Sequence, residues 1–120
     1  MIGRLDHVQL AMASGKESAV RIFCVDVLGL EEIAKPETLV GRGGVWFRIP
    51  AGGELHYGVE DDFTPAKKAH PAFTTSRLDD LASRLVENNY PVAWDDALLP
   101  RRRFYTADPF GNRIEFLESG

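Results

Sequence analysis

Two short stretches, GELHY at residues 53–57 and NRIEF at residues 112–116, decide the fold. In both, polar and apolar residues alternate as in a strand with one buried face, and both follow a turn signal. The letters differ, but the apolar positions coincide when one stretch is laid over the other. This coincidence predicts two copies of one structural unit, each ending in the same kind of strand.

The first copy begins with an alternating strand and continues into an amphipathic helix. Ser14 and Glu17 have the spacing of a capping box, which predicts that the helix opens at Ser14. Apolar residues then recur every three or four positions until Gly29, a predicted C-cap. The strands of this copy are predicted at residues 6–12, 30–34, 45–49 and 54–59.

The second copy repeats this order. Ser76 and Asp79 repeat the capping spacing before a second amphipathic helix, which Asn88 and Asn89 end. Strands are predicted at residues 70–75, 92–94, 104–107 and 113–118. The order of one strand, one helix and three strands therefore occurs twice.

This repetition predicts a single α+β domain over residues 1–120, built from paired βαβββ modules. The first module is predicted to cover about residues 1–60, the connector residues 61–69 and the second module residues 70–120.

The composition is that of a globular domain with a formal net charge of −4 and 44% hydrophobic residues. This excludes a disordered chain, and the basic run 101–103 is too short for nucleic-acid binding. No apolar run reaches the length of a membrane span, and no signal segment precedes the first strand. The single cysteine, Cys24, falls in an apolar helical pattern and is predicted to be a buried core residue. We expect a cytoplasmic protein with neither nucleic-acid nor membrane partners.

The chain has three histidines, and their positions follow the repeat. His7 and His70 occupy the same place in the first strand of each copy, while His56 and Glu115 occupy the same place in the last. Imidazole nitrogens and carboxylate oxygens are the ligands of zinc, nickel, manganese, iron and cobalt sites. Taken singly, a histidine on a half-buried strand is more often a hydrogen-bonded core or surface residue. A second interpretation is that the cluster lines a ligand cavity without an ion.

Four stretches together resemble the vicinal oxygen chelate superfamily, which includes glyoxalase I, fosfomycin-resistance proteins, bleomycin-resistance proteins and extradiol dioxygenases. They are LDHVQLA at 5–11, Phe23 with DVLGL at 26–30, AHPAF at 69–73, and Phe104-Tyr105 with DPFGNRIEF at 108–116. The resemblance implies that the paired modules form a curled mixed sheet around a central cavity that holds a divalent metal.

The resemblance also implies the ligand positions. His7, His70 and Glu115 match the ligands of the three-ligand members, and His56 matches the fourth ligand of glyoxalase I, which has a glutamate there. Like its relatives, the chain would chelate two adjacent oxygens of a small substrate, as a lyase, isomerase or transferase. A homodimer is expected by the same analogy.

Two functions follow as hypotheses. In the first, a metal-dependent enzyme, His56 and Glu115 are the candidate catalytic residues, and Arg102 or Arg103 holds an anionic substrate group. The candidate residues of the substrate pocket are Gln9, Trp46, Arg103 and Tyr105. In the second, a metal-free binding protein sequesters a small molecule. Its aromatic walls would be Trp46, Phe47, Trp94 and Phe104.

Overall fold

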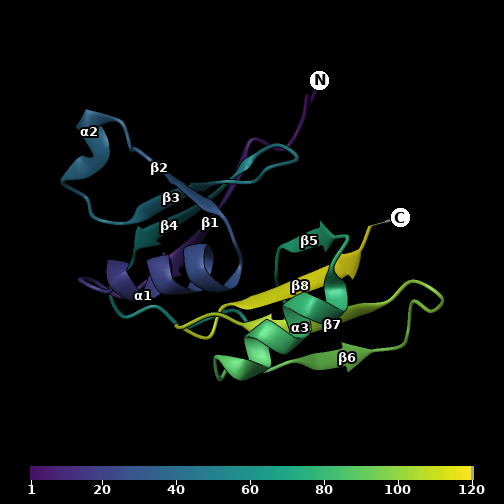
Figure 1. The fold of residues 1–120 in the computed structure, drawn as a ribbon. Coiled ribbons are helices and arrows are strands. Elements are labelled where there is room, and N and C mark those ends of the chain that lie inside the picture. Colours follow the sequence, from purple (N-terminus) through teal and green to yellow (C-terminus); the bar gives the residue numbers. More distant parts are fainter. Residues whose placement is uncertain (120) are drawn as a thin grey trace. The chain divides into compact units, whose positions relative to one another are not determined.

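The computed structural model describes residues 1–119 as two units, unit 1 from Met1 to Thr64 and unit 2 from Pro65 onward. Their boundary falls between residues that the sequence assigns to the connector. Each unit contains one four-stranded mixed sheet with helical segments beside it (Figure 1).

Unit 1 has the strand order β1-β4-β3-β2, with β1 parallel to β4 and the other pairs antiparallel. Its elements are β1 (His7–Met12), α1 (Glu17–Arg21), the π-helix η1 (Ile22–Val27), β2 (Glu31–Ile33), α2 (Glu37–Val40), β3 (Val45–Arg48) and β4 (Glu54–Val59).

Unit 2 has the equivalent order β5-β8-β7-β6, again with its first and last strands parallel. Its elements are β5 (Ala72–Thr75), α3 (Leu78–Glu87), β6 (Ala93–Asp95), β7 (Arg103–Ala107) and β8 (Arg113–Glu118). The predicted α+β fold of paired βαβββ modules is confirmed. The predicted bounds of β4 and β8 are also confirmed, whereas α2 lies where no helix was predicted.

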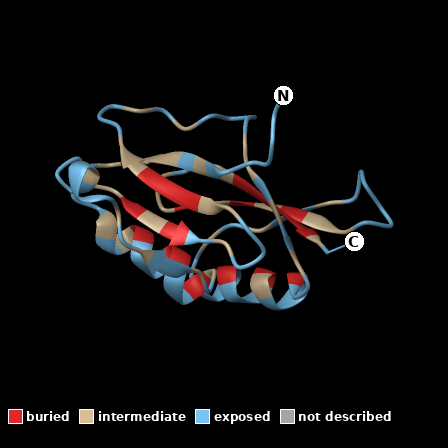
Figure 2. Ribbon diagram, turned by 90° about the horizontal axis from the view of Figure 1, so that it is seen from above, coloured by how far each residue is buried: buried red, intermediate tan, exposed pale blue. Residues whose placement is uncertain are grey.

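The helices bury their apolar faces against the strands, and buried residues lie on the sides of the helices that face the sheets (Figure 2). In unit 1, α1 contacts β3 and η1 contacts β2, and in unit 2, α3 contacts β8. Phe23, Phe47 and Phe104 are completely buried, and burial of each such side chain stabilises the fold by roughly 1.5–3 kcal/mol. Cys24 is buried as predicted. Among residues 1–119, no helix has the length and apolar character needed to span a membrane.

The predicted helix starts were wrong. The helix of unit 1 begins at Glu17 with Lys16 as its N-cap, and no side chain caps it. The Glu17 carboxylate instead accepts a hydrogen bond from the Gly44 backbone N–H at 3.2 Å, which lowers its pKa. Ser76 does not cap α3 either, because the Thr75 hydroxyl accepts the Arg77 N–H at 3.0 Å. Local side-chain turns of this kind compete with capping.

The helix ends agree with the sequence. Gly29 has a φ of 74° and ends η1, and the N–H of the next residue, Leu30, bonds to the Cys24 carbonyl at 2.8 Å. Asn89, with a φ of 67°, follows α3. The predicted start of β5 was wrong, because the strand begins at Ala72 and leaves His70 in the segment before it. Proline at position 71 has no N–H to donate to a neighbouring strand.

Gly44 provides a test of the turn that leads into β3. Its φ is 92°, and a Cβ built there would lie 2.2 Å from the Tyr57 carbonyl oxygen. We therefore expect Gly44→Ala to lower the free energy of unfolding by roughly 3 kcal/mol or more, measured by urea denaturation. Gly41→Ala is the matched control, because nothing lies within 4 Å of its Cβ position and its φ is −67°. An equal effect of the two substitutions would contradict this account of the turn.

Candidate functional site

Strand register makes His56 and Glu115 equivalent positions of the two units. His56 on β4 lies opposite Trp46 on β3 and Gln9 on β1. Glu115 on β8 lies opposite Tyr105 on β7 and Ala72 on β5. Directly opposed residues share a face of the sheet, so each unit presents one polar row on that face. His56 and Glu115 are nevertheless buried, with 3% and 5% of their surfaces exposed.

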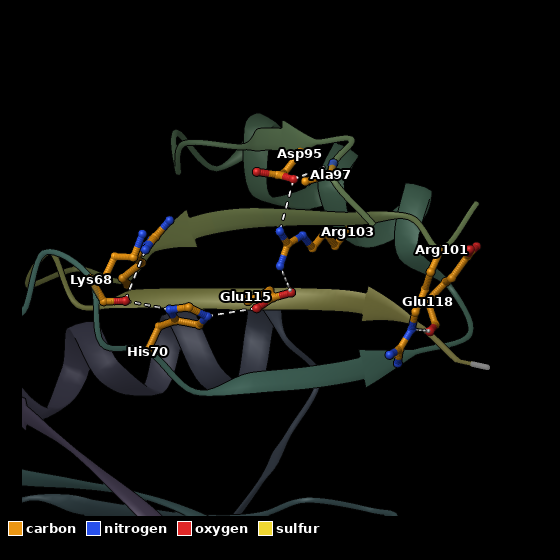
Figure 3. Close-up of polar contacts among 9 residues, drawn as sticks. Lys68, His70, Asp95, Ala97, Arg101, Arg103, Glu115 and Glu118 are labelled. Atoms are coloured by element: carbon orange, nitrogen blue, oxygen red, sulfur yellow. Dashed lines mark hydrogen bonds and ion pairs between the residues drawn. The ribbon is translucent and has the colours of Figure 1, made fainter. Parts of the chain in front are cut away.

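In unit 2 a chain of polar contacts crosses the sheet from β6 to the segment before β5 (Figure 3). Arg103 Nη2 lies 3.2 Å from Asp95 Oδ1, and Arg103 Nη1 lies 3.1 Å from Glu115 Oε2. The other carboxylate oxygen of Glu115, Oε1, lies 2.9 Å from His70 Nε2. Glu115 therefore has one oxygen directed at an arginine and one at an imidazole.

The second nitrogen of His70 is fixed by the backbone. His70 Nδ1 lies 2.8 Å from the Lys68 carbonyl oxygen, which also accepts a hydrogen bond from Arg113 Nη1 at 3.1 Å. A carbonyl oxygen only accepts, so Nδ1 donates and the lone pair of a neutral ring is on Nε2. That lone pair is directed at Glu115 Oε1. Both ring nitrogens of His70 therefore lie within hydrogen-bonding distance of an oxygen atom.

Unit 1 holds the other two histidines in a stack. The His56 ring lies 3.8 Å from the Trp46 ring and 4.2 Å from the His7 ring, centroid to centroid. His56 Nε2 contacts Glu54 Oε1 at 2.7 Å, and His7 Nδ1 contacts Asp6 Oδ2 at 2.9 Å. The hydrogen bond from His7 lowers the pKa of Asp6. His7 is therefore held through its Nδ1, as His70 is in unit 2.

In unit 2 the Arg103 guanidinium contacts two carboxylates, Glu115 and Asp95. An unpaired buried carboxylate is costly, and Arg103 supplies the opposite charge to Glu115. Burial lowers the pKa of Arg103, but its hydrogen bonds to Glu115 and Asp95 outweigh that effect and the net shift is upward. The Ala97 N–H and, to a smaller extent, Arg103 lower the pKa of Asp95. Within residues 1–119, Arg103 Nε is a buried donor without a partner.

The structure places the proposed pocket residues in different surroundings. Gln9 and Trp46 line a cavity of about 250 Å³ in unit 1. Tyr105 instead lies under two arginines, with Arg113 4.0 Å and Arg103 5.4 Å from its ring centroid.

The arginines expected to hold a substrate anion are paired within the chain. Arg102 forms two hydrogen bonds with Asp79, at 2.8 and 2.9 Å, and Arg103 contacts Glu115 and Asp95. Phe47 and Phe104 are core residues and not the ligand walls that the binding-protein hypothesis expected. No motif pointed to Lys35 and Arg42, which line the cavity in unit 1.

The structure thus brings the candidate ligands together as two pairs, His7 with His56 and His70 with Glu115. Among residues 1–119, no three side chains of histidine, cysteine, aspartate or glutamate form a group that could hold a metal ion.

Comparison with known proteins gave no match to a family model and none to a curated protein. Among solved structures, a protein from Bacillus anthracis assigned to the glyoxalase family is 46% identical, with a TM-score of 0.93 over 100% of this chain and 98% of that chain. A glyoxalase/dioxygenase from Nostoc punctiforme is 26% identical, with a TM-score of 0.78 over 98% and 91%. A member of the glyoxalase/bleomycin resistance protein/dioxygenase superfamily from Sphaerobacter thermophilus has the same fold at 17% identity, with a TM-score of 0.77 over 98% of each chain.

The pair between Arg103 and Glu115 can be tested by a double-mutant cycle. Their side chains are 16% and 6% exposed, so Arg103→Met should cost about 3 kcal/mol of unfolding free energy by leaving the carboxylate buried without its cation. In a Glu115→Gln background the same substitution should cost less, by roughly 1–3 kcal/mol. Arg101→Met is the control, since Arg101 is exposed and contacts no carboxylate oxygen of Glu115. Equal costs in both backgrounds would contradict the pairing.

The lowered pKa of Asp95 predicts a pH dependence of stability. A carboxyl whose folded-state pKa lies below its ordinary value of 3.8 stabilises the fold above that pH, and the contribution is lost as the pH falls through the folded-state pKa. Asp95→Asn should therefore lower the urea midpoint at neutral pH, and its difference from the unsubstituted protein should shrink as the pH approaches 2. Asp96→Asn controls for the loss of one negative charge next to it. A difference for Asp95→Asn that is independent of pH would contradict the prediction.

Proposed function

Because the chain belongs to the glyoxalase/bleomycin resistance/dioxygenase superfamily, which has the vicinal oxygen chelate fold, we propose that it is a divalent-metal-dependent enzyme. The proposed enzyme chelates two adjacent oxygens of a small substrate and acts as a lyase, isomerase or transferase. Its proposed metal ligands are His7, His70 and Glu115, with His56 as a fourth ligand or a base.

The hydrogen bonding of His70 carries this proposal. Metal-ligating histidines commonly donate one ring N–H to a carbonyl or carboxylate, which orients the other nitrogen toward the ion. His70 Nδ1 has such a partner in the Lys68 carbonyl, and Nε2 converges with Glu115 Oε1 at 2.9 Å. These two atoms would be neighbouring ligands of a bound ion.

His7 supports the proposal with the same arrangement. Its Nδ1 is held by the Asp6 carboxylate, and Nε2 has no hydrogen-bond partner among residues 1–119. Two imidazoles and one carboxylate suit zinc, nickel, manganese, iron or cobalt, and they leave positions open for substrate. His7 and His56 lie in unit 1, His70 and Glu115 lie in unit 2, and a homodimer is also part of the proposal.

The residues around the site have separate proposed roles. A bound divalent ion would supply Lewis-acid stabilisation of the negative charge that develops on the substrate oxygens. Glu54 holds the His56 ring at 2.7 Å, and Trp46 covers one face of that ring. An imidazole held in this way by a carboxylate can take up a substrate proton as a general base, provided that it is not itself a ligand. Arg103 orients Glu115 by holding Oε2, which leaves Oε1 for the ion.

One observation favours the metal-free binding protein as a second candidate function. Both oxygens of Glu115 already have partners, His70 and Arg103, so the carboxylate is neutralised without an ion. In this second candidate the polar face of each sheet would bind a small molecule and perform no chemistry. For either function we propose the cytoplasm as the compartment, since the single cysteine gives no indication of a disulfide-forming environment.

Metal content separates the two candidates. We expect untagged protein, reconstituted with zinc or manganese and dialysed, to retain about one ion per site by elemental analysis. His7→Ala, His70→Ala and Glu115→Gln should each weaken metal affinity at least 10-fold, because each removes one donor atom.

Glu118→Gln, a carboxylate change on the same strand as Glu115, should leave metal affinity unchanged, and circular dichroism should confirm that every variant is folded. Protein that retains no ion after reconstitution, or ligand variants that retain it fully, would exclude the enzyme as proposed.

A further inference from the structure

A cavity in unit 1 is lined by Gln9 and Trp46, the two residues that pair with His56. Two positions after His56 on β4 lies Gly58, and a Cβ there would lie 2.5 Å from Gln9 Nε2. Gly58 is paired with Ala11 on β1, and Gly44 lies beside it at the start of β3. Gly58 thus leaves room for the Gln9 side chain, which lines the cavity together with Trp46.

Unit 2 has a long side chain at the position that is equivalent to Gly44. Val45 pairs with Tyr57 in unit 1, and Phe104 pairs with Phe116 in unit 2. Val45 and Phe104 are therefore equivalent positions. The residues that precede them, Gly44 and Arg103, are equivalent as well. Arg103 is the arginine that neutralises Glu115. The two copies have thus diverged at this position: unit 2 has the arginine that pairs with the carboxylate, and unit 1 has a glycine.

Two cationic side chains line this cavity. Lys35 and Arg42 flank α2 and line the cavity with Leu39, and none of the described lining residues is acidic. Lys35 donates a hydrogen bond to the Gly43 carbonyl. Within residues 1–119 neither cation lies within 4.0 Å of a carboxylate oxygen, whereas Arg21 and Arg48 of the same unit each pair with a glutamate. The nearby Glu17 carboxylate is engaged by the Gly44 N–H.

From this geometry we infer that the cavity binds the anionic group, a carboxylate or phosphoryl group, of a small organic acid, through Lys35 and Arg42. The inference rests on the proposed function in taking this face of unit 1 as the substrate face. Two residues along a strand span about 7 Å. The anionic group of the substrate therefore lies about 7 Å from the substrate oxygens that would lie beside His56. Trp46, which lines the cavity and stacks on His56, connects the two ends.

Fluorescence of Trp46 can report this binding directly. The chain has two tryptophans, so Trp94→Phe leaves Trp46 as the single indole. At constant ionic strength, phenylacetate and benzylphosphonate are titrated against this protein, with neutral phenylacetamide as the matched probe. We expect saturable quenching by at least one anion, at least 10-fold tighter than by the amide, and the tighter anion identifies the preferred group.

Lys35→Gln and Arg42→Gln should each weaken anion binding about 10-fold, since each removes one charge-assisted contact. Arg48→Gln, which removes an exposed, ion-paired cation of the same unit, should leave it unchanged. Metal is measured in the same samples before and after chelation. If the protein binds the anion but retains no metal, only the proposed metal-dependent enzyme is contradicted, because Lys35 and Arg42 bind the anion without a metal ion. Absence of saturable quenching, equal binding of the amide, or an equal effect of Arg48→Gln would overturn the inference.

Discussion

The parallel pairing of the first strand with the last strand in each unit holds the candidate site in place. Strands β1 and β4 are separated along the chain by two other strands and three helical segments, yet they run side by side in one register. A slip of one residue would turn every side chain of a strand to the opposite face. The stacking of His7 on His56 and the convergence of His70 on Glu115 therefore depend on these two pairings.

The same backbone arrangement supports different chemistry in the two units. In unit 2 the central carboxylate is buried, and its cost is offset by Arg103, which in turn contacts Asp95. In unit 1 the central residue is an imidazole, which needs no such cation, and the position equivalent to Arg103 is glycine. The cavity that we assign to the substrate anion is lined by Lys35, Arg42 and Trp46 of this unit. Duplication thus accounts for the geometry that the two units share. Differences at a few positions account for the different chemistry of their central residues.

Much of the fold could be predicted because strand alternation is a local property. The bounds of β4 and β8 followed from it, as did the equivalence of His56 and Glu115. The helix starts could not be predicted from the spacing of Ser14 and Ser76. The Glu17 carboxylate accepts the distant Gly44 N–H, and the Thr75 hydroxyl accepts the Arg77 N–H. Spacing alone does not report which acceptor a backbone N–H reaches in three dimensions.

The candidate site was predictable only in part, for a similar reason. Imidazoles and carboxylates are recognisable as potential ligands wherever they fall in a repeat. The partners that orient them come from distant or backbone positions, such as the Lys68 carbonyl for His70 and Arg103 for Glu115. Lys35 and Arg42 flank a one-turn helix that the sequence did not indicate, and only the folded chain shows that they line the cavity beside Trp46.

The proposed metal-dependent enzyme requires His7 and His70 to bind the same ion. Nitrogen-15 NMR of histidine-labelled protein during a zinc titration tests this most directly, with His7→Ala and His70→Ala used to assign the rings. The account predicts that the Nε2 resonances of His7 and His70 shift together and reach their end points at the same zinc equivalence. A shift of one ring without the other, or of neither, would contradict it.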